Sequence, residues 1–339
     1  LRIQGVWRGQ LKPIAGAAFA GVLGIVLPAV LGVHLAVQPG EILKTAETQP
    51  VGVKKVALGR AAPSAIPGQQ RKISALPLAP TRLSTLESVF DRYDYDLQAI
   101  AEGREGVPPI FVKRLPGDWR SIERAEKRKR MFVKTMLPLI LKANAEIRLD
   151  RRRLLALAEE SGGDPDTLSD GARYWLNQLA GRYSLDSIDF GALKQRVDII
   201  PVSLALAQAA NESGWGTSRF ARQGNALFGQ WTWDSSQGIA PKELQSGKGD
   251  YAVRKFDALG QSVSAYMLNL NTHSAYKPLR QRRARLRAAG QALSGATLAA
   301  GLIKYSQRGK AYIEEIQGMI SYNNFDRYDN ISLGSAALG

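Results

Sequence analysis

Residues 201–229 read P-V-S-L-A-L-A-Q-A-A-N-E-S-G-W-G-T-S-R-F-A-R-Q-G-N-A-L-F-G, and the first ten of them are mostly apolar. This pattern predicts a largely buried helix with a proline in its first turn, where a missing backbone N–H is tolerated. Its apolar positions are Val202, Leu204, Leu206, Ala209 and Ala210. We expect the helix to end at residues 213–216, Ser-Gly-Trp-Gly, because two glycines let the chain turn sharply.

Glu212 falls on the last turn of this predicted helix. The helix dipole is negative there, which disfavours a carboxylate, and the neighbouring Trp215 adds an apolar surface. Both effects favour a carboxylic acid that keeps its proton near neutral pH, as a general acid must. By position alone, however, a glutamate at a helix end is most often a solvated surface residue, so both interpretations stay open at this point.

Composition limits the possible chemistry. The chain has 339 residues, 45% of them hydrophobic, and a net charge of +16, which favours nucleic acid, acidic lipid headgroups or an acidic cell-wall polymer as partners. It has no cysteine and only two histidines, His34 and His273, which argues against a metal site and a Ser-His-Asp triad. We therefore expect no metal and no cofactor, and chemistry based on carboxylates, tyrosines or backbone.

Residues 13–37 carry no formal charge over 25 positions, which is long enough to cross a membrane. Arg2, Arg8 and Lys12 precede them, so the positive-inside rule keeps the N-terminus in the cytoplasm. We predict a single-pass anchor in the cytoplasmic membrane, with the catalytic domain in the periplasm or outside the cell. A cleaved signal peptide and a buried core helix are the alternatives.

The rest of the chain divides by composition into four further parts. Residues 39–83 are predicted to be a flexible linker, 84–130 a helical and extended lead-in with a capping box at Ser84 and Glu87, 131–326 the catalytic domain, and 327–339 a frayed tail. Helical periodicity dominates the catalytic domain, with one helix predicted around residues 132–147 and another from Leu154 to Glu160.

Two stretches of the catalytic domain differ from this helical pattern. Residues 230–233 and 251–256 are aromatic and β-branched, which predicts two strands of a small β lobe. Residues 280–287 hold five arginines in eight positions and are interpreted as a solvated helix face. A single acid at a helix end suggests glycosidic chemistry, which usually requires a second carboxylate. Asp234, Glu243, Asp250 and Asp257 of the β lobe are the candidates.

The motif Ala207-Gln208-Ala209-Ala210-Asn211-Glu212-Ser213-Gly214-Trp215-Gly216, followed by Leu227-Phe228-Gly229, resembles the glucosaminidase domain of glycoside hydrolase family 73. That family contains FlgJ-like bacterial peptidoglycan hydrolases. Leu137-Pro138, Asn144, Gln230-Trp231 and residues 305–312, Y-S-Q-R-G-K-A-Y, are similar to its Bax-type, membrane-associated branch. The resemblance covers about residues 107–325. It implies a mainly α, lysozyme-like helical domain with a small β-hairpin lobe, here preceded by the predicted transmembrane helix and linker.

The resemblance also implies roles for particular residues. Glu212 is expected to be the general acid that protonates the leaving oxygen, and Glu243, 31 positions later and 13 before Phe256, the base or stabiliser. Tyr305 matches a tyrosine that lines the family's cleft and helps catalysis. The substrate-binding candidates are Trp215, Asn225, Phe228, Gly229, Gln230, Trp231, Tyr276 and Arg308.

Some of these candidates have plain structural alternatives. The aromatic residues can equally belong to the core, Tyr305 can simply pack against a neighbouring helix, and we expect Trp231 to be the more exposed of the aromatics. Ala226 departs from the family pattern, because many members have asparagine directly before Leu-Phe-Gly, whereas here Asn225 comes one position early.

The expected activity is hydrolysis of β-1,4 bonds in peptidoglycan glycan strands by an endo-β-N-acetylglucosaminidase. A muramidase or lytic transglycosylase is the alternative within enzymes, and a non-catalytic wall-binding or scaffold protein is the alternative outside them. The mechanism, retaining, inverting or assisted by the substrate's N-acetyl group, stays open, because it depends on the separation of the carboxyl groups. We expect glycan strands and the inner membrane as partners and no nucleic acid, since only the charge favours nucleic acid and the predicted export signal argues against it.

Overall fold

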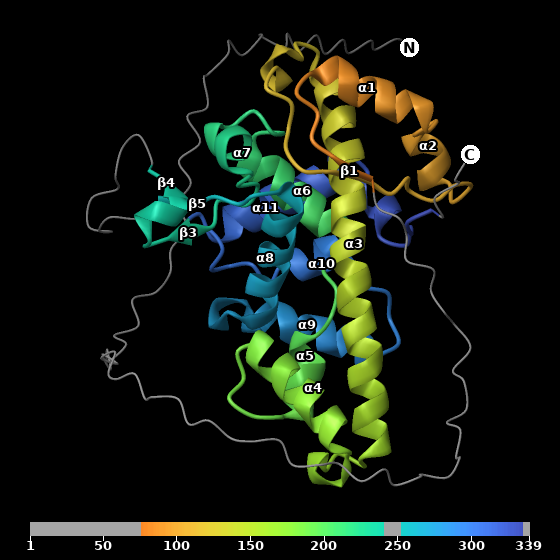
Figure 1. Ribbon diagram of the computed structural model, residues 1–339, viewed down its shortest axis with the longest axis vertical. Coiled ribbons are helices and arrows are strands. Elements are labelled where there is room, and N and C mark those ends of the chain that lie inside the picture. The colour runs from red at the N-terminus through yellow and green to blue at the C-terminus, as the bar shows by residue number, and fades with distance from the viewer. Residues whose placement is uncertain (1–75, 241–251, 335–339) are drawn as a thin grey trace, which may run out of the picture.

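The computed structural model describes residues 76–240 and 252–334. Its helices are α1 (Leu83–Arg92), α2 (Leu97–Ala101), α3 (Ala125–Glu160), α4 (Asp170–Arg182), α5 (Phe190–Arg196), α6 (Val202–Ser213), α7 (Arg219–Gly224), α8 (Leu259–Thr272), α9 (Lys277–Ala288), α10 (Gly295–Ala299) and α11 (Lys310–Tyr322). Its strands are β1 (Leu76–Leu78), β2 (Ile110–Val112), β3 (Trp231–Thr232), β4 (Gly238–Ile239) and β5 (Ala252–Arg254). The described part is thus mainly helical with small sheets, as predicted (Figure 1).

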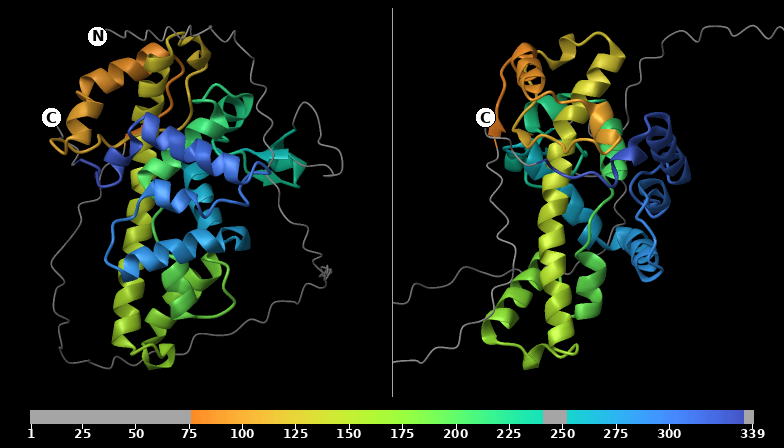
Figure 2. Two further views of the ribbon diagram at one scale, coloured as in Figure 1. Left: turned by 180° about the vertical axis from the view of Figure 1, so that it is seen from behind. Right: turned by 90° about the vertical axis from the view of Figure 1, so that its right-hand side faces the viewer.

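Helix α3 runs along almost the full length of the molecule (Figures 1 and 2). It has 36 residues, which at 1.5 Å per residue span about 54 Å. We expected two helices with the basic run 151–153 opening the second, but α3 continues through that run. Arg152 and Arg153 are exposed while Leu154 is buried, so the charged side chains occupy the solvent side of an uninterrupted amphipathic helix.

Helix α6 is the buried centre of the domain, as the opening motif predicted. Ten of its 12 residues are buried, and it contacts α3, α10, α11 and a short 3₁₀ helix at Phe325–Tyr328. Leu204 and Leu206 are fully buried, and each contributes roughly 1.5–3 kcal/mol of hydrophobic stabilisation. The helix ends at Gly214, whose φ of 56° is the left-handed conformation that glycine adopts without strain.

The N-terminus of α6 is capped by a residue far along the chain. Pro201 precedes the helix without a side-chain cap, and the two carboxylate oxygens of Asp329 accept hydrogen bonds from the backbone N and the Oγ of Ser203, both at 2.8 Å. Residues 327–334 are therefore not the frayed tail that we expected. Tyr328 is buried, and Leu333 bridges to Val107, because this stretch closes the base of α6.

The arginines of α9 are a second correction. Arg280 and Arg283 are 5% and 1% exposed, so the segment is not simply a solvated face. Arg283 donates hydrogen bonds to the carbonyl oxygens of Asp198, Ile199 and Gln195 at 2.9–3.0 Å. The Asp198 carboxylate also receives two hydrogen bonds from Arg287, at 3.0 and 3.1 Å. The Arg283 guanidinium group is buried because it satisfies carbonyls at the C-terminal end of α5 and the turn after it, and Arg280 does the same for the carbonyls of Leu270 and His273 at the end of α8.

The lead-in segment belongs to the same hydrophobic core as the helical domain. Strand β1 pairs in parallel with β2, so the expected linker ends before residue 76, and its remainder, 39–75, lies outside the described residues. The expected capping box at Ser84 is wrong. The helix α1 begins one residue earlier, and the backbone N of Leu83 donates instead to Asp118 Oδ1 at 2.8 Å, across 35 positions of sequence.

The second sheet confirms the predicted small β lobe and adds one strand to it. Its order is β3-β5-β4, with both outer strands antiparallel to β5. It projects from the side of the helical body in Figure 1. The predicted membrane segment, residues 13–37, lies outside the described residues. Within the described ranges, every helix falls short of the length or the apolar character that a membrane crossing requires.

Candidate active site

The Glu212 carboxyl group is the most strongly perturbed acid whose chemistry the sequence singled out. The residue lies on the last turn of α6 and is partly exposed. Burial of the carboxyl group raises the pKa of Glu212 to about 7, although a hydrogen bond from Tyr312 and the nearby Arg308 act in the opposite direction. A carboxyl group with this pKa is about half protonated at pH 7, whereas an ordinary glutamate is almost fully ionised there, so Glu212 can serve as a general acid.

A chain of three hydrogen bonds leads from the core to this carboxyl group. The Tyr266 hydroxyl donates to Gln208 Oε1 at 2.7 Å, and Gln208 Nε2 donates to the Tyr312 hydroxyl oxygen at 2.9 Å. The Tyr312 hydroxyl in turn donates to Glu212 Oε1 at 2.8 Å. Because an amide nitrogen can only donate, the single hydrogen of Tyr312 is left for Glu212.

This direction of donation determines which oxygen of Glu212 carries the proton. Oε1 already accepts a hydrogen bond from Tyr312, whereas Oε2 has no protein partner within the part of the chain that the structure describes. The proton of the neutral acid therefore resides on Oε2. Glu212 thus has one oxygen held by the core and one free to meet a reacting group.

Tyr305 lies one layer behind this contact. Its ring stacks on that of Tyr312, with 5.3 Å between centroids and 10° between planes, but its hydroxyl donates to the carbonyl oxygen of Phe228 at 3.3 Å. Tyr276 packs on its other side, 5.8 Å between centroids, and both tyrosines are buried. Burial raises the pKa of each well above its usual value. The tyrosine in hydrogen-bond contact with Glu212 is thus Tyr312.

Trp215 is held in the turn that follows α6. Its φ is 57°, and its carbonyl oxygen accepts a hydrogen bond from the indole nitrogen of Trp119 at 2.9 Å. Its ring contacts Phe132 and Phe325 edge-on or tilted, with centroids 5.7 and 6.1 Å apart. Trp215 therefore has a packing role, and part of its surface remains exposed.

The candidates at residues 225–229 form the connection between α7 and the β lobe. Asn225 is buried, has a φ of 52°, and donates through Nδ2 to the carbonyl oxygen of Phe256 at 2.8 Å. Phe228 is 1% exposed and stacks on Tyr266 at 3.9 Å. Gly229 has a φ of 61°, which suits glycine. Asn225 and Phe228 thus hold the lobe in place.

The next two candidates are partly exposed. The side-chain oxygen of Gln230 is buried without a hydrogen-bond partner in the described part, so it has an unused acceptor. Trp231 lies in β3 and is partly exposed, unlike the buried Phe228 and Tyr276.

Arg308 and Glu243 are the last two candidates. Arg308 is paired with Glu315 on α11, close enough to Glu212 for both charges to affect the pKa of that acid. Glu243 lies outside the described residues.

Sequence reasoning missed Gln208, Tyr266 and Tyr312 as site residues. Two signals pointed to them. Gln208 is a long polar residue in an otherwise apolar buried helix, four positions before Glu212, and such a residue requires partners. Tyr312 ends the same Y-S-Q-R-G-K-A-Y stretch in which Tyr305 was selected.

Glu212 is a carboxylic acid whose pKa lies near neutrality and whose Oε2 has no partner among the described residues, at the end of a buried helix in a mainly helical domain. Acid-catalysed cleavage of a glycosidic bond requires such a proton donor. The fold and the site together therefore define a helical glycoside hydrolase.

Comparison with known proteins narrows this class to a family. The family model described as "Glucosaminidase: Mannosyl-glycoprotein endo-beta-N-acetylglucosaminidase" matches residues 189–325. The protein Bax of Escherichia coli (strain K12) is 35% identical over 212 residues, which are 61% of this chain and 73% of Bax. The crystal structure of the catalytic domain of the autolysin Auto from Listeria monocytogenes matches with 19% identity and a TM-score of 0.31, over 48% of this chain and 89% of that one. The chain belongs to the glucosaminidase family, as its motif indicated.

Proposed function

We propose that this protein hydrolyses β-1,4 glycosidic bonds of peptidoglycan glycan strands as an endo-β-N-acetylglucosaminidase, with Glu212 as the general acid. The observation that carries the proposal is the carboxyl group of Glu212, whose burial raises its pKa to about 7 and whose Oε1 is held by Tyr312. Membership of the glucosaminidase family supports the choice of substrate.

In this mechanism Glu212 Oε2 donates its proton to the glycosidic oxygen as the bond to the anomeric carbon breaks. The donor becomes a carboxylate, and the hydrogen bond from Tyr312 stabilises that charge at Oε1. Arg308 favours the same charged form, while Glu315 opposes it. Groups that already point at the developing negative charge, such as the Tyr312 hydroxyl, lower the activation barrier because they need not rearrange during the reaction.

Breakage of the glycosidic bond also requires a nucleophile at the anomeric carbon. This is either a water molecule activated by a base or the substrate's own N-acetyl oxygen, which forms a cyclic intermediate that water then opens. We propose Glu243, which falls between strands β4 and β5 in the sequence, as the base or stabiliser, while attack by the substrate's own N-acetyl oxygen is the alternative. The variant Glu243→Gln separates the two. A direct base predicts a loss of about 10²- to 10⁴-fold in rate. Substrate assistance predicts a smaller loss with Glu243→Gln and a large loss on a glycan whose N-acetyl groups have been removed.

The decisive experiment digests purified sacculi with wild-type protein, Glu212→Gln and the control Glu314→Gln, an exposed glutamate on α11. We expect reducing N-acetylglucosamine ends by mass spectrometry with wild type and the control. Glu212→Gln should lower the rate by about 10²- to 10⁴-fold. Reducing N-acetylmuramic acid ends would indicate a muramidase, and anhydro ends a lytic transglycosylase. Equal behaviour of wild type and Glu212→Gln would instead favour a wall-binding or scaffold protein.

We further propose that residues 13–37 tether the domain to the cytoplasmic membrane and that it acts on the outer side. The apolar, uncharged composition of that segment and the basic residues before it support this proposal. Fractionation of cells that express the full chain tests it, since a tethered protein sediments with membranes and resists extraction by high salt.

A further inference from the structure

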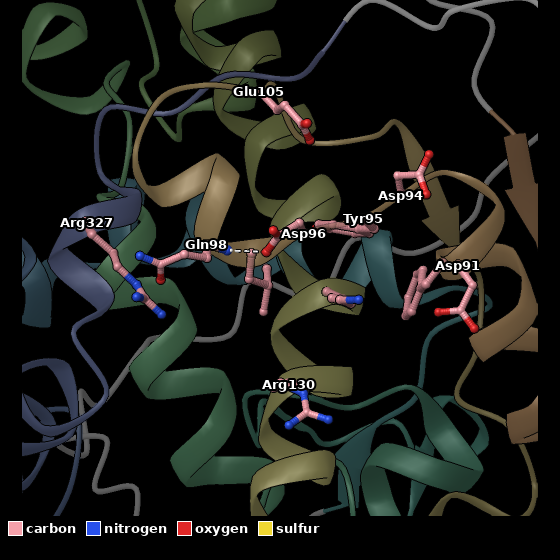
Figure 3. A pocket seen from close by; sticks show the side chains of 11 residues that line it. Asp91, Asp94, Tyr95, Asp96, Gln98, Glu105, Arg130 and Arg327 are labelled. Atoms are coloured by element: carbon pink, nitrogen blue, oxygen red, sulfur yellow. Dashed lines mark hydrogen bonds between the residues drawn. The ribbon is translucent and has the colours of Figure 1, made fainter.

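A pocket with a volume of about 820 Å³ lies between the lead-in segment and α3 (Figure 3). Its walls come from α1, the loop that follows it, α2, the N-terminal half of α3 and the 3₁₀ helix at Phe325–Tyr328. All of its lining residues fall outside residues 189–325, the part matched by the glucosaminidase model. The pocket therefore lies outside the part of the chain that the family model matches, and its size suits a small organic ligand.

Charges of both signs face this pocket without neutralising each other. Its acidic residues are Asp91, Asp94, Asp96 and Glu105, and its basic residues are Arg130, Lys134 and Arg327. Within the described ranges, none of the seven takes part in an ion pair. In Figure 3 the carboxylates of Asp91, Asp94 and Glu105 lie at the right and top of the view, and the two arginines lie at the left and bottom.

A buried hydroxyl group in the same pocket lacks a partner. Tyr95 lines the pocket and is only 2% exposed, and its hydroxyl makes no hydrogen bond in the described part of the chain. Lys134 lies over the rings of Tyr95 and Phe90, 5.4 and 5.7 Å from their centroids. A buried hydroxyl without a hydrogen-bond partner destabilises the folded state by about 1–3 kcal/mol. The Tyr95 hydroxyl beside Lys134, which has no ion-pair partner among the described residues, therefore indicates that a ligand supplies the missing acceptor.

The pocket continues toward the candidate active site. A second pocket of about 340 Å³ shares Leu97, Arg130 and Arg327 with the first and is also lined by Trp215. Trp215 lies in the turn that directly follows Glu212 and α6. The two pockets are thus neighbours, and the second reaches the turn that follows the helix that carries the acid.

The mixture of charges selects the ligand. A polyanion such as a nucleic acid or a phospholipid headgroup layer would meet four carboxylates, and a polycation would meet three basic groups. A molecule that carries both ammonium and carboxylate groups satisfies both sets.

We propose that this pocket binds a short zwitterionic peptide, with its ammonium group toward Asp91, Asp94 and Glu105 and its carboxylate toward Arg130, Lys134 and the Tyr95 hydroxyl. This inference rests on the proposed function in one respect: if the substrate is peptidoglycan, the ligand is the peptide branch of the strand that is being cleaved. The lead-in segment would then select strands that still carry their peptides.

Calorimetric titration of the full chain with the tetrapeptide L-alanyl-γ-D-glutamyl-meso-diaminopimelyl-D-alanine tests the proposal. We expect binding by wild type, at least about tenfold weaker binding by Lys134→Gln and Arg130→Gln, and unchanged binding by Lys142→Gln, which alters an exposed lysine farther along α3. Acetylation of the peptide's two free amines, on its alanyl and diaminopimelyl residues, should weaken binding as well. The proposal would be overturned if wild type bound the acetylated peptide as tightly as the unmodified one, or if Lys134→Gln bound the peptide as tightly as wild type does. The absence of binding by wild type at millimolar peptide would also overturn it.

Tyr95→Phe separates ligand binding from a structural role. Because the Tyr95 hydroxyl has no hydrogen-bond partner among residues 76–240 and 252–334, its removal should leave the melting temperature unchanged or raise it, while peptide affinity falls severalfold. A lower melting temperature with unchanged affinity would contradict the proposal.

The ratio of kcat/KM on peptide-bearing strands to kcat/KM on strands stripped of peptides completes the test. We expect this ratio to fall in Lys134→Gln and to stay at the wild-type value in Lys142→Gln. Peptide binding without hydrolysis by wild type would refute the proposed function alone. Hydrolysis without peptide binding, or a ratio that Lys134→Gln leaves unchanged, would refute the peptide site alone.

Discussion

Glu212→Gln should make the protein more stable at alkaline pH while removing its activity. The pKa of Glu212 is raised from 4.5 to about 7, so the folded state prefers the neutral acid. As the pH rises from about 4.5 to about 7, wild type progressively loses the stability that this preference gives, whereas glutamine stays neutral throughout. Glutamine also keeps an oxygen that accepts the Tyr312 hydrogen bond.

The expected size of the effect follows from the difference in pKa. At 1.36 kcal/mol per pKa unit, the variant should be more stable than wild type by about 3 kcal/mol at pH 8. For a domain of this size that corresponds to a melting temperature roughly 6–12 °C higher. Below pH 4 the carboxyl group is protonated in both the folded and the unfolded state, and the difference should vanish.

Thermal unfolding followed by circular dichroism between pH 4 and pH 8 measures this difference. Glu314→Gln is the matched control, because it makes the same chemical change at an exposed position of α11 and should give a small, pH-independent shift. A Glu212→Gln variant that is no more stable than wild type at pH 8 would refute the reasoning. So would a stabilisation of equal size at pH 4 and pH 8, since that would reflect packing and not ionisation.

Three further outcomes are expected from the contacts described above. Tyr312→Phe removes the hydrogen bond that favours the ionised form of Glu212, so the pKa of Glu212 should rise. The alkaline limb of the pH profile of kcat/KM should therefore move to higher pH by about one unit. No shift, or a shift to lower pH, would contradict the role of Glu212 as the general acid held by Tyr312. Arg283→Met leaves three buried carbonyls and Asp198 short of partners and should lower the free energy of unfolding by about 3–5 kcal/mol in urea denaturation, whereas a loss below about 1 kcal/mol would show that the guanidinium is dispensable. Gly295→Ala places a Cβ 2.1 Å from Ser203 Oγ and 2.7 Å from the backbone N of Leu204, so it should lower the free energy of unfolding by about 1–3 kcal/mol by disturbing the contact of α10 with α6. In the control Gly318→Ala the added Cβ has no such neighbour within 4 Å, so this change should be neutral or stabilising. Equal effects of the two changes would argue against close packing at Gly295.

Local patterns in the sequence were sufficient for the central helix and for the β lobe. The apolar run after Pro201 and the glycines after Glu212 predicted α6 to within a residue, because burial and termination are both encoded next to the residues that they affect. Strands around Trp231 and Val253 were likewise predicted, and they pair with each other.

Contacts between distant residues were beyond local reasoning. The sequence around Ser84 suggested a capping box, but Asp118 supplies the partner for the start of α1, and Asp329 does the same for α6. The arginines of α9 were interpreted as solvated, since nothing near them in sequence reveals the carbonyls that Arg283 satisfies. A charged or polar side chain can be predicted to be exposed only if the fold provides no buried hydrogen-bond partner for it.

At the candidate site, the acid was predictable and its support was not. The position of Glu212 conflicts with the helix dipole, and the resemblance of residues 207–216 to the family motif then selected it as the acid. Gln208 stands out as a polar residue in an apolar helix, but the identity of its partner and the contact of Tyr312 with the acid depend on how α11 packs against α6. The role of Glu243 remains a prediction.

The capping of α6 by Asp329 also sets the size of the smallest piece that can be expected to work. A fragment trimmed to residues 189–325 would lose the carboxylate at one end of the acid-bearing helix and the Trp119 indole that fastens the turn at its other end. An isolated catalytic fragment should therefore keep residues 76–334 together, since Asp329 and Trp119 contact the two ends of the helix that carries the acid.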